Sequence, residues 1–228
     1  MCFLDFQYPS LNFVNIKHLR ERRNIKNDKN KNMNIQAIVD KTLPFFEAHK
    51  NEGDIEVEIR LGRHNGSLFD TNVGKDVWKR VLNALKKYDG WEEKKTKSVE
   101  VYYNDSNSIR ITSDEDSGEQ EMIQKIKVHK EDFVDSQQPL DVRFCIAREI
   151  PTTGEYEMDR KRSKTRHSFV RKNLSIDMTI SSGDNADMDS EEEASYQIEL
   201  EIINPKDVDS VYKFFNIINK INDISKLV

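Results

Sequence analysis

Apolar and polar residues alternate over much of the chain, and the stretch DIEVEIRLG, residues 54–62, shows this pattern in its simplest form. Isoleucine, valine and leucine occupy every second position, and Glu56, Glu58 and Arg60 lie between them. A period of two predicts a β-strand with one apolar face and one charged face. Taken alone, such a strand is typical of a sheet that has one face in the core and one in water.

Further strand-like segments follow, separated by turn sequences such as SDEDSGE and PTTGE. Connections this short favour antiparallel neighbours, and seven or eight strands are enough to close a barrel. The predicted strands lie near residues 91–103, 107–113, 120–130, 140–150, 155–170, 172–181 and 194–203.

Apolar residues at helical spacing predict three helices. The first covers residues 35–50, where Pro44 is able to kink or split it. The second lies in GKDVWKRVLNALKKYDG and ends near Gly90, and we expect Trp78 and Trp91 in its core contacts. A single final helix is predicted after Pro205, with the apolar stripe Val208, Val211, Tyr212, Phe215, Ile218 and Ile221.

Charge is segregated along the predicted strands, and this separates two possible architectures. In an open sheet the charged face would be solvated, whereas in a closed barrel it would line a polar tunnel. Solvated faces normally mix signs to form cross-strand pairs, but here glutamates gather on the first and last strands and basic residues gather between them. We therefore predict an α+β fold, with a closed antiparallel eight-stranded β-barrel and helices packed on the outside.

Composition narrows the functional classes. The 228 residues are 34% charged and carry a net charge of -5, which argues against a protein that coats nucleic acid but permits a local basic site. Cys2 and Cys145 form neither a disulfide framework nor a metal site, so a reducing, intracellular compartment is expected. No apolar run is long enough to cross a membrane.

The expected domain organisation is simple. Residues 1–34 are predicted to be an N-terminal extension and polar linker, and residues 35–228 to be one tunnel domain. The acidic stretch SSGDNADMDSEEEAS is predicted to be a solvated loop between the last two strands.

The segregated charges predict a chemistry. Four carboxylates in one small region repel one another unless a divalent cation joins them, and hard oxygen ligands suit Mg²⁺ or Mn²⁺. Guanidinium and ammonium groups opposite such a metal suit a polyanion, of which phosphate is the obvious example. The acidic set is Glu56, Glu58, Glu199 and Glu201, and the basic set is Arg110, Lys125, Lys127, Arg162, Lys164 and Arg166.

The segments IEVEIRLG, RSKTRHSF, IDMTI and YQIELEII, in this order, resemble the motifs of the triphosphate tunnel metalloenzymes. More specifically, they resemble the metal-dependent RNA 5'-triphosphatases of fungal, protozoan and large DNA-virus mRNA capping systems. The resemblance spans about residues 54–203. It implies a polynucleotide 5'-phosphatase that removes the γ-phosphate from nascent mRNA, the first step of capping, with nucleoside triphosphates as further substrates.

The resemblance also implies roles for individual residues. Arg143, which shares a strand face with Glu149, is a further substrate-binding candidate, and Gln197 and Ser175 depart from the family pattern. The implied roles are metal binding by Glu56, Glu58, Glu199 and Glu201; triphosphate contact by Arg110, Arg162, Lys164, Arg166, Thr179 and one of Lys125 or Lys127; placement of the attacking water by Glu149; and catalysis by Asp177.

Structural interpretations are expected for three other residues on or near these strands. Arg60 is predicted to pair with a neighbouring glutamate, His167 to point opposite to Arg166, and Cys145 to be a buried inert thiol.

Two other functional classes remain open from the sequence. One is a tripolyphosphatase or other small-triphosphate tunnel hydrolase, and the other is a polyphosphate-binding module without catalysis. The resemblance also implies a guanylyltransferase partner, as a further domain or a separate subunit. An Asn/Lys/Ile-rich composition is compatible with a large DNA virus or a protozoan, and oligomeric state is not indicated.

Overall fold

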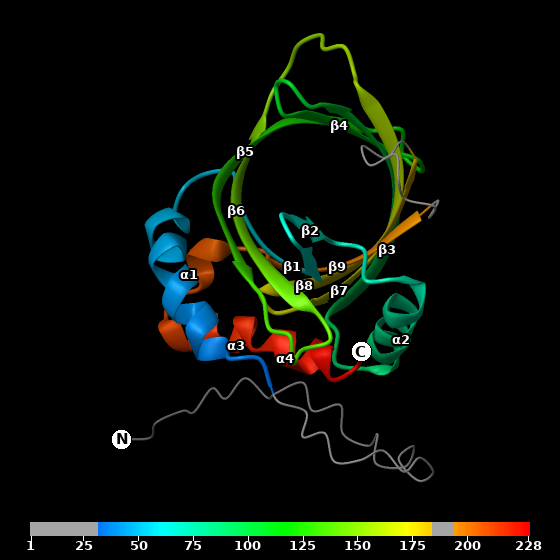
Figure 1. The fold of residues 1–228 in the computed structure, drawn as a ribbon. Helices are drawn as coiled ribbons and strands as arrows, with labels where there is room; N and C mark the ends of the chain where they lie inside the picture. Colours follow the sequence, from blue (N-terminus) through cyan, green and yellow to red (C-terminus); the bar gives the residue numbers. More distant parts are fainter. Residues whose placement is uncertain (1–31, 184–193) are drawn as a thin grey trace.

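A closed ring of antiparallel strands forms the body of the molecule (Figure 1). The computed structural model describes residues 32–183 and 194–228. Within them the strand order is β2-β1-β6-β5-β4-β3-β7-β8-β9, and pairing of β1 with β9 closes an eight-stranded barrel, to which β2 is added. The predicted fold is therefore confirmed. The strands are β1 (Ile55–Asn65), β2 (Leu68–Asp70), β3 (Glu93–Asn104), β4 (Ile109–Asp114), β5 (Gln120–Phe133), β6 (Asp141–Pro151), β7 (Arg160–Arg171), β8 (Leu174–Gly183) and β9 (Ala194–Ile202).

Helices cover the outside of one half of this ring. The hydrophobic core lies between them and the outer strand faces, where Val57, Ile59 and Leu61 of β1 are almost completely buried. Trp78 is also buried, as expected. Alternation thus places the apolar faces outward, under the helices, and leaves the charged faces for the lumen. The helices are α1 (Ile35–His49), α2 (Lys75–Lys87), the 3₁₀-helix η2 (Pro205–Asp207), α3 (Val211–Ile218) and α4 (Lys220–Ser225).

The structure differs from two of the helical predictions. Helix α1 runs uninterrupted through Pro44. The single C-terminal helix was wrong, because the chain forms η2, α3 and α4 in succession. The Ser210 side chain accepts a hydrogen bond from Lys213 N and starts α3 afresh, which changes the buried face. Val211 and Tyr212, expected in the apolar stripe, are consequently 52% and 56% exposed.

Strand β7 begins at Arg160, later than the predicted residue 155, for a topological reason. Alternating antiparallel pairings place the end of β6 and the start of β7 at opposite ends of the barrel, so residues 152–159 must run along its length. Thr152 N donates to Met122 O at the start of this segment, and Asn104 Nδ2 donates to Glu157 O near its end.

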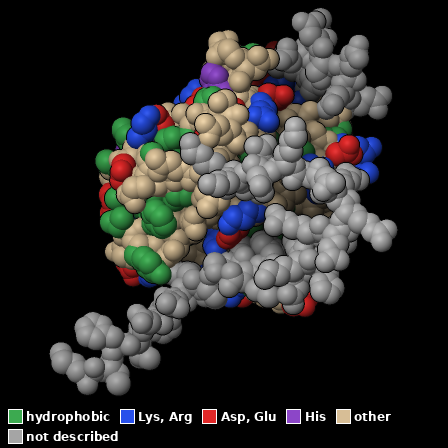
Figure 2. Space-filling model, turned by 60° about the horizontal axis from the view of Figure 1, so that its bottom comes forward, with side chains coloured by type: hydrophobic (Ala, Val, Ile, Leu, Met, Phe, Trp, Pro, Cys, Tyr) green, Lys and Arg blue, Asp and Glu red, His purple; other side chains and the backbone are tan. Residues whose placement is uncertain are grey.

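Charged residues of both signs are scattered over the face shown in Figure 2, whereas hydrophobic side chains gather on the side where α1 lies in Figure 1. Phe45 of α1 and Val211 and Tyr212 of α3 are among the exposed large hydrophobic residues. None of the helices in the described residues has the length and apolarity needed to span a membrane. The predicted extension over residues 1–31 and most of the predicted acidic loop, residues 184–193, lie outside the described part of the chain.

Candidate active site

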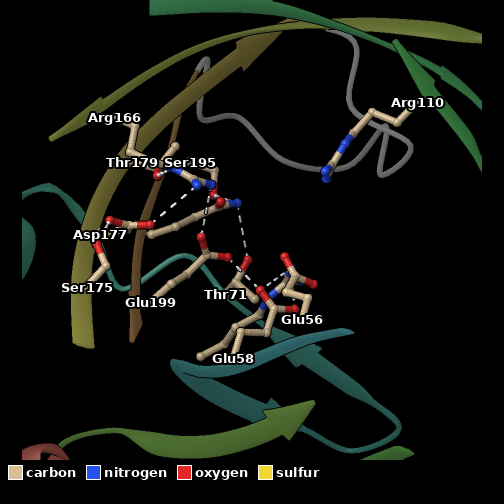
Figure 3. A network of polar contacts seen from close by, with 12 residues as sticks. Glu56, Glu58, Thr71, Arg110, Arg166, Ser175, Asp177, Thr179, Ser195 and Glu199 are labelled. Carbon is tan, nitrogen blue, oxygen red and sulfur yellow. Dashed lines mark hydrogen bonds and ion pairs between the residues drawn. The ribbon is translucent and has the colours of Figure 1, made fainter. Parts of the chain in front are cut away.

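The charged strand faces meet inside the barrel. Closure of the ring pairs Glu58 with Glu201 and Arg60 with Glu199 between β1 and β9. Figure 3 shows the carboxylates of Glu56, Glu58 and Glu199 on one side of the lumen, with Arg110 projecting from the opposite wall. Residues from both ends of the sequence are therefore brought together by the register of the closing strands.

Buried carboxylates form the floor of this lumen. Glu58 and Glu199 are 6% and 8% exposed. Burial, together with the charge of Glu58, raises the pKa of Glu56 to about 8. Burial, together with the charge of Asp177, raises the pKa of Glu201 to about 7. These raised pKa values show that the cluster lacks enough positive charge to keep all its carboxylates ionised at neutral pH.

Lys125 of β5 reaches into this acidic cluster. Its Nζ contacts Glu56 and lies 3.0 Å from Glu149 Oε1 and 3.9 Å from Glu58 Oε1. The other candidate, Lys127, lies opposite Ala147 in the register and its side chain is exposed. Of the two lysines, the structure thus brings Lys125 to the carboxylates.

Glu199 is in a different electrostatic state from its neighbours. Burial opposes its ionisation, but the guanidinium groups of Arg60 and Arg166 lower the pKa of Glu199 to about 2. Arg60 Nε and Arg166 Nη2 lie 3.1 Å and 3.3 Å from its carboxylate oxygens. Arg60 also forms an ion pair with Glu58 at 2.8 Å, so the predicted pairing with a neighbouring glutamate is confirmed.

Arg166 is oriented by three groups on β8 and β9. Its Nε donates to Thr179 Oγ1 at 3.2 Å, its Nη1 to Asp177 Oδ2 at 3.3 Å and its Nη2 to Glu199 Oε2 at 3.3 Å. Ser175 Oγ donates in turn to Asp177 Oδ1 at 2.6 Å. Asp177 and Thr179, predicted as a catalytic and a substrate-binding residue, therefore hold the Arg166 guanidinium in place.

Basic residues line the lumen opposite the carboxylates. Arg110, Lys164 and Arg166 border a cavity of about 210 Å³ beneath β3 and β4. Burial lowers the pKa of Lys164, which favours loss of its proton unless an anion binds nearby and stabilises the charged form. Arg162 lies on the same face of β7, level with Val101 and Gly183. The lining residues are Lys97, Val99, Val101, Arg110, Thr112, Glu121, Lys164 and Arg166.

Glu149 and Arg143, both on β6, are paired with charged residues of other strands. Glu149 Oε1 lies 2.9 Å from Arg110 Nη2, and the charges of Arg110 and Lys125 lower its pKa although burial opposes this. Arg143 forms two hydrogen bonds with Asp132 and lies over the ring of Phe69 at 4.5 Å. Arg143 thus lies near the start of β6, opposite Arg60 in the register, and is paired with Asp132 rather than with a carboxylate of the floor.

Three carboxylates of the lumen offer oxygen donors for a divalent cation. Among residues 32–183 and 194–228, no group of three or more His, Cys, Asp or Glu side chains is already arranged to hold a metal ion. Nevertheless, Glu56, Glu58 and Glu201 are adjacent hard oxygen donors whose mutual repulsion a cation would relieve. These three residues fit Mg²⁺ or Mn²⁺, whereas Glu199 is already neutralised by two arginines.

Residues 13–227 match the family described as mRNA capping enzyme, beta chain. The chain belongs to this family. No curated protein sequence matches it significantly. Among solved structures, it is similar to the Pct1 RNA triphosphatase of S. pombe, with 15% identity, a TM-score of 0.64, and coverage of 91% of this chain and 93% of that one. Pct1 has also been solved in complex with the Spt5 CTD.

A second similar structure is the triphosphatase domain of the mimivirus capping enzyme. It is 15% identical with a TM-score of 0.55, and the match covers 80% of this chain and 96% of that one. At these identities the likeness shows the shared tunnel fold.

Some lumen residues of this capping-enzyme chain were not found from sequence. Thr71, which follows β2, accepts a hydrogen bond from Gln197 Nε2 at 3.3 Å, and Gln197 also lies 3.3 Å from Ser195 Oγ (Figure 3). A lone threonine after a three-residue strand carries no motif that could reveal it. His167 hydrogen-bonds Thr96 and lies beside Trp78, outside the lumen, as expected.

Proposed function

We propose that the chain is a metal-dependent RNA 5'-triphosphatase, a hydrolase that removes the γ-phosphate from the 5' end of nascent mRNA. The proposal rests on family membership and on one arrangement, the opposition of Glu56, Glu58 and Glu201 to a basic wall across a single lumen. Opposed clusters of this kind suit a polyanion bound together with a hard cation. Nucleoside triphosphates carry the same phosphates and are included as substrates.

The basic wall binds the triphosphate. Arg110, Lys164 and Arg166, with Arg162 on the same strand face, hold the β- and γ-phosphates and stabilise charge that develops on their oxygens. Because Asp177, Thr179 and Glu199 orient Arg166 beforehand, little reorganisation is needed when substrate binds. The roles of Asp177 and Thr179 are therefore positioning roles in this proposal.

Glu149 orients the attacking water. Its lowered pKa keeps it ionised at neutral pH, and an ionised carboxylate accepts a hydrogen bond from water. The water oxygen attacks the γ-phosphorus in line, and the bond from phosphorus to the bridging oxygen breaks. The diphosphate end leaves with the electron pair of that bond, giving diphosphate-ended RNA and inorganic phosphate.

A divalent cation completes the proposed site. Mg²⁺ or Mn²⁺ held by Glu56, Glu58 and Glu201 would act as a Lewis acid and neutralise phosphate charge. Lys125, in contact with Glu56 and Glu149, balances the remaining carboxylates. Lys127 as a phosphate contact and Arg143 as a substrate-binding residue stay predictions.

The proposed assembly follows the capping reaction. Residues 35–228 would form the triphosphatase domain, preceded by an extension over residues 1–34. A guanylyltransferase, which uses the diphosphate end as its substrate, would act as a separate domain or subunit.

The first experiment measures phosphate release from γ-labelled triphosphate-ended RNA, with Mg²⁺, with Mn²⁺ and with a chelator. Wild type, Glu56→Ala and Glu100→Ala are compared. Glu100 is a matched control because it pairs with Lys161 on the outer face of β3. We expect metal-dependent release that is lost in Glu56→Ala and kept in Glu100→Ala.

Other outcomes would favour the two alternatives. Release from tripolyphosphate with none from RNA would identify a small-triphosphate hydrolase of the same fold. Tight binding of triphosphate without any release would identify a binding module and overturn the proposal.

A further inference from the structure

Two arginine–aromatic stacks lie at one end of the barrel. Arg143 Cζ lies 4.5 Å from the centre of the Phe69 ring, and Arg160 Cζ lies 4.0 Å from the centre of the Tyr103 ring. Each guanidinium is held by two hydrogen bonds to one aspartate, Arg143 to Asp132 and Arg160 to Asp105, all between 2.6 and 3.0 Å. The same device thus occurs twice.

Topology places both stacks at the same opening. In the antiparallel ring, the starts of β6 and β7 and the ends of β1 and β3 lie at one end of the barrel. Arg143 is near the start of β6, Arg160 is the first residue of β7, and Tyr103 is near the end of β3. Strands β5, β4 and β3 separate β6 from β7 in the ring, so the stacks flank the opening.

Phe69 lies on the lumen side of β1. Gly62 shares the inward face of Glu58 and Arg60 by alternation, and a Cβ on Gly62 would lie 2.6 Å from Phe69 Cε1. The segment after the β1–β2 turn therefore folds back over the opening, and Figure 1 shows β2 within the ring of strands. This places the Phe69 ring where a chain leaving the lumen would pass it.

We infer that this opening binds the first nucleotides of the RNA, whose bases stack on the guanidinium planes of Arg143 and Arg160 and on their aromatic partners. The inference rests on the proposed function and extends it from the triphosphate to the nucleotides. Single-stranded RNA is recognised largely by stacking on aromatic rings and arginine planes. The Arg143 and Arg160 side chains are 18% and 25% exposed, so they are fixed but accessible.

The outer face of β7 offers a contrast. Lys161, next to Arg160 but pointing out of the barrel, is paired with Glu100 at 2.5 Å, and its side chain is 45% exposed. This lysine supplies a matched control, because its removal deletes one charge at the same end of the barrel without affecting either stack.

The test compares KM and kcat for a 5'-triphosphate oligoribonucleotide and for tripolyphosphate. The variants are Arg160→Ala and Phe69→Leu, which keeps apolar volume but removes the aromatic face, with Lys161→Ala as the control. We expect the KM for RNA to rise about tenfold in the first two variants, since stacking of a base is worth about 1–3 kcal/mol. Values for tripolyphosphate, which has no base, should change less than about twofold.

Arg160→Lys separates stacking from charge. It keeps one positive charge but loses the planar group, so its KM for RNA should stay raised. Full recovery in Arg160→Lys would overturn the stacking inference. Equal losses for RNA and tripolyphosphate, or a selective RNA defect in Lys161→Ala, would overturn it as well. A wild-type enzyme that releases phosphate from no substrate would instead refute the proposed function.

Discussion

Arg60 Nε lies 3.1 Å from Glu199 Oε1 across the β1–β9 pairing that closes the barrel. The same guanidinium is 2.8 Å from Glu58 Oε1 on its own strand. One side chain therefore links the two closing strands and is paired with two of the lumen carboxylates.

Replacing Arg60 by Met should destabilise the protein. Glu58 and Glu199 would stay buried with less positive charge beside them. Because one third of the Arg60 side chain is in solvent, which screens part of the interaction, the unfolding free energy should fall by only about 2 kcal/mol. Urea denaturation measures the change. Lys97→Met, which breaks an exposed pair with Asp114, should cost less than about 1 kcal/mol. An equal effect of the two substitutions would show that Arg60 is no more than a surface ion pair.

Stability in the presence of a chelator should depend on pH in two opposite ways. Glu56 and Glu201, with pKa values raised to about 8 and about 7, bind protons more strongly when folded, so stability should rise as pH falls from 8 towards 5. Glu199, with its pKa lowered to about 2, acts in the opposite sense, and its contribution is lost as pH falls from about 4.5 towards 2.

Urea unfolding midpoints measured between pH 3 and pH 8 test this dependence of stability on pH. The slope on the alkaline side should be about 1 kcal/mol per pH unit, and Glu56→Gln should reduce it. A flat profile in wild type would contradict the raised pKa values.

Arg166→Lys should impair turnover on every triphosphate substrate. A single ammonium cannot reach Thr179, Asp177 and Glu199 together, so the positive charge would no longer be oriented. We expect kcat/KM to fall about 10- to 100-fold for RNA and tripolyphosphate alike. Arg171→Lys, on the outer face of β7, is the control. Unchanged kinetics in Arg166→Lys would mean that charge alone matters at this position.

Much of this arrangement could be predicted because strand alternation is a local property. Glu56, Glu58 and Arg60 face one way in any strand that contains them, and the segregation of charges indicated a lumen rather than a wet surface. The choice between Lys125 and Lys127 could not be made from the local sequence. It depends on the register of β5 against β6, which shifts between Lys127 and His129.

The rest required the three-dimensional pairing. Arg160 and Asp105 are 55 positions apart, and no spacing rule joins them. Strand β2 has three residues, too few to show alternation. The division of the C-terminal segment into separate helices was not predicted. A cap at Ser210 restarts the helix, and the predicted apolar stripe is continuous only if one uninterrupted helix is assumed.

Cys145 should be unreactive although it faces the lumen opposite Glu58. Burial and the charge of Glu58 raise the pKa of the Cys145 thiol to about 11, so little thiolate exists at pH 8. In a Cys2→Ser background, alkylation by iodoacetamide should be about a hundredfold slower than for free cysteine and should accelerate about tenfold per pH unit up to pH 10. Rapid labelling at pH 8 would contradict the raised pKa.

Gly62→Ala should displace the segment that follows the β1–β2 turn. A Cβ at this position would lie 2.1 Å from the Asp70 carbonyl oxygen, and a backbone atom cannot yield as a flexible side chain would. The strain should cost about 1–3 kcal/mol and lower the thermal midpoint. Gly53→Ala, where a Cβ meets nothing within 4 Å, is the control. Because Phe69 would move with Asp70, Gly62→Ala should also raise the KM for triphosphate-ended RNA more than that for tripolyphosphate. A variant with wild-type stability and kinetics would show that β2 does not pack against Gly62 in solution.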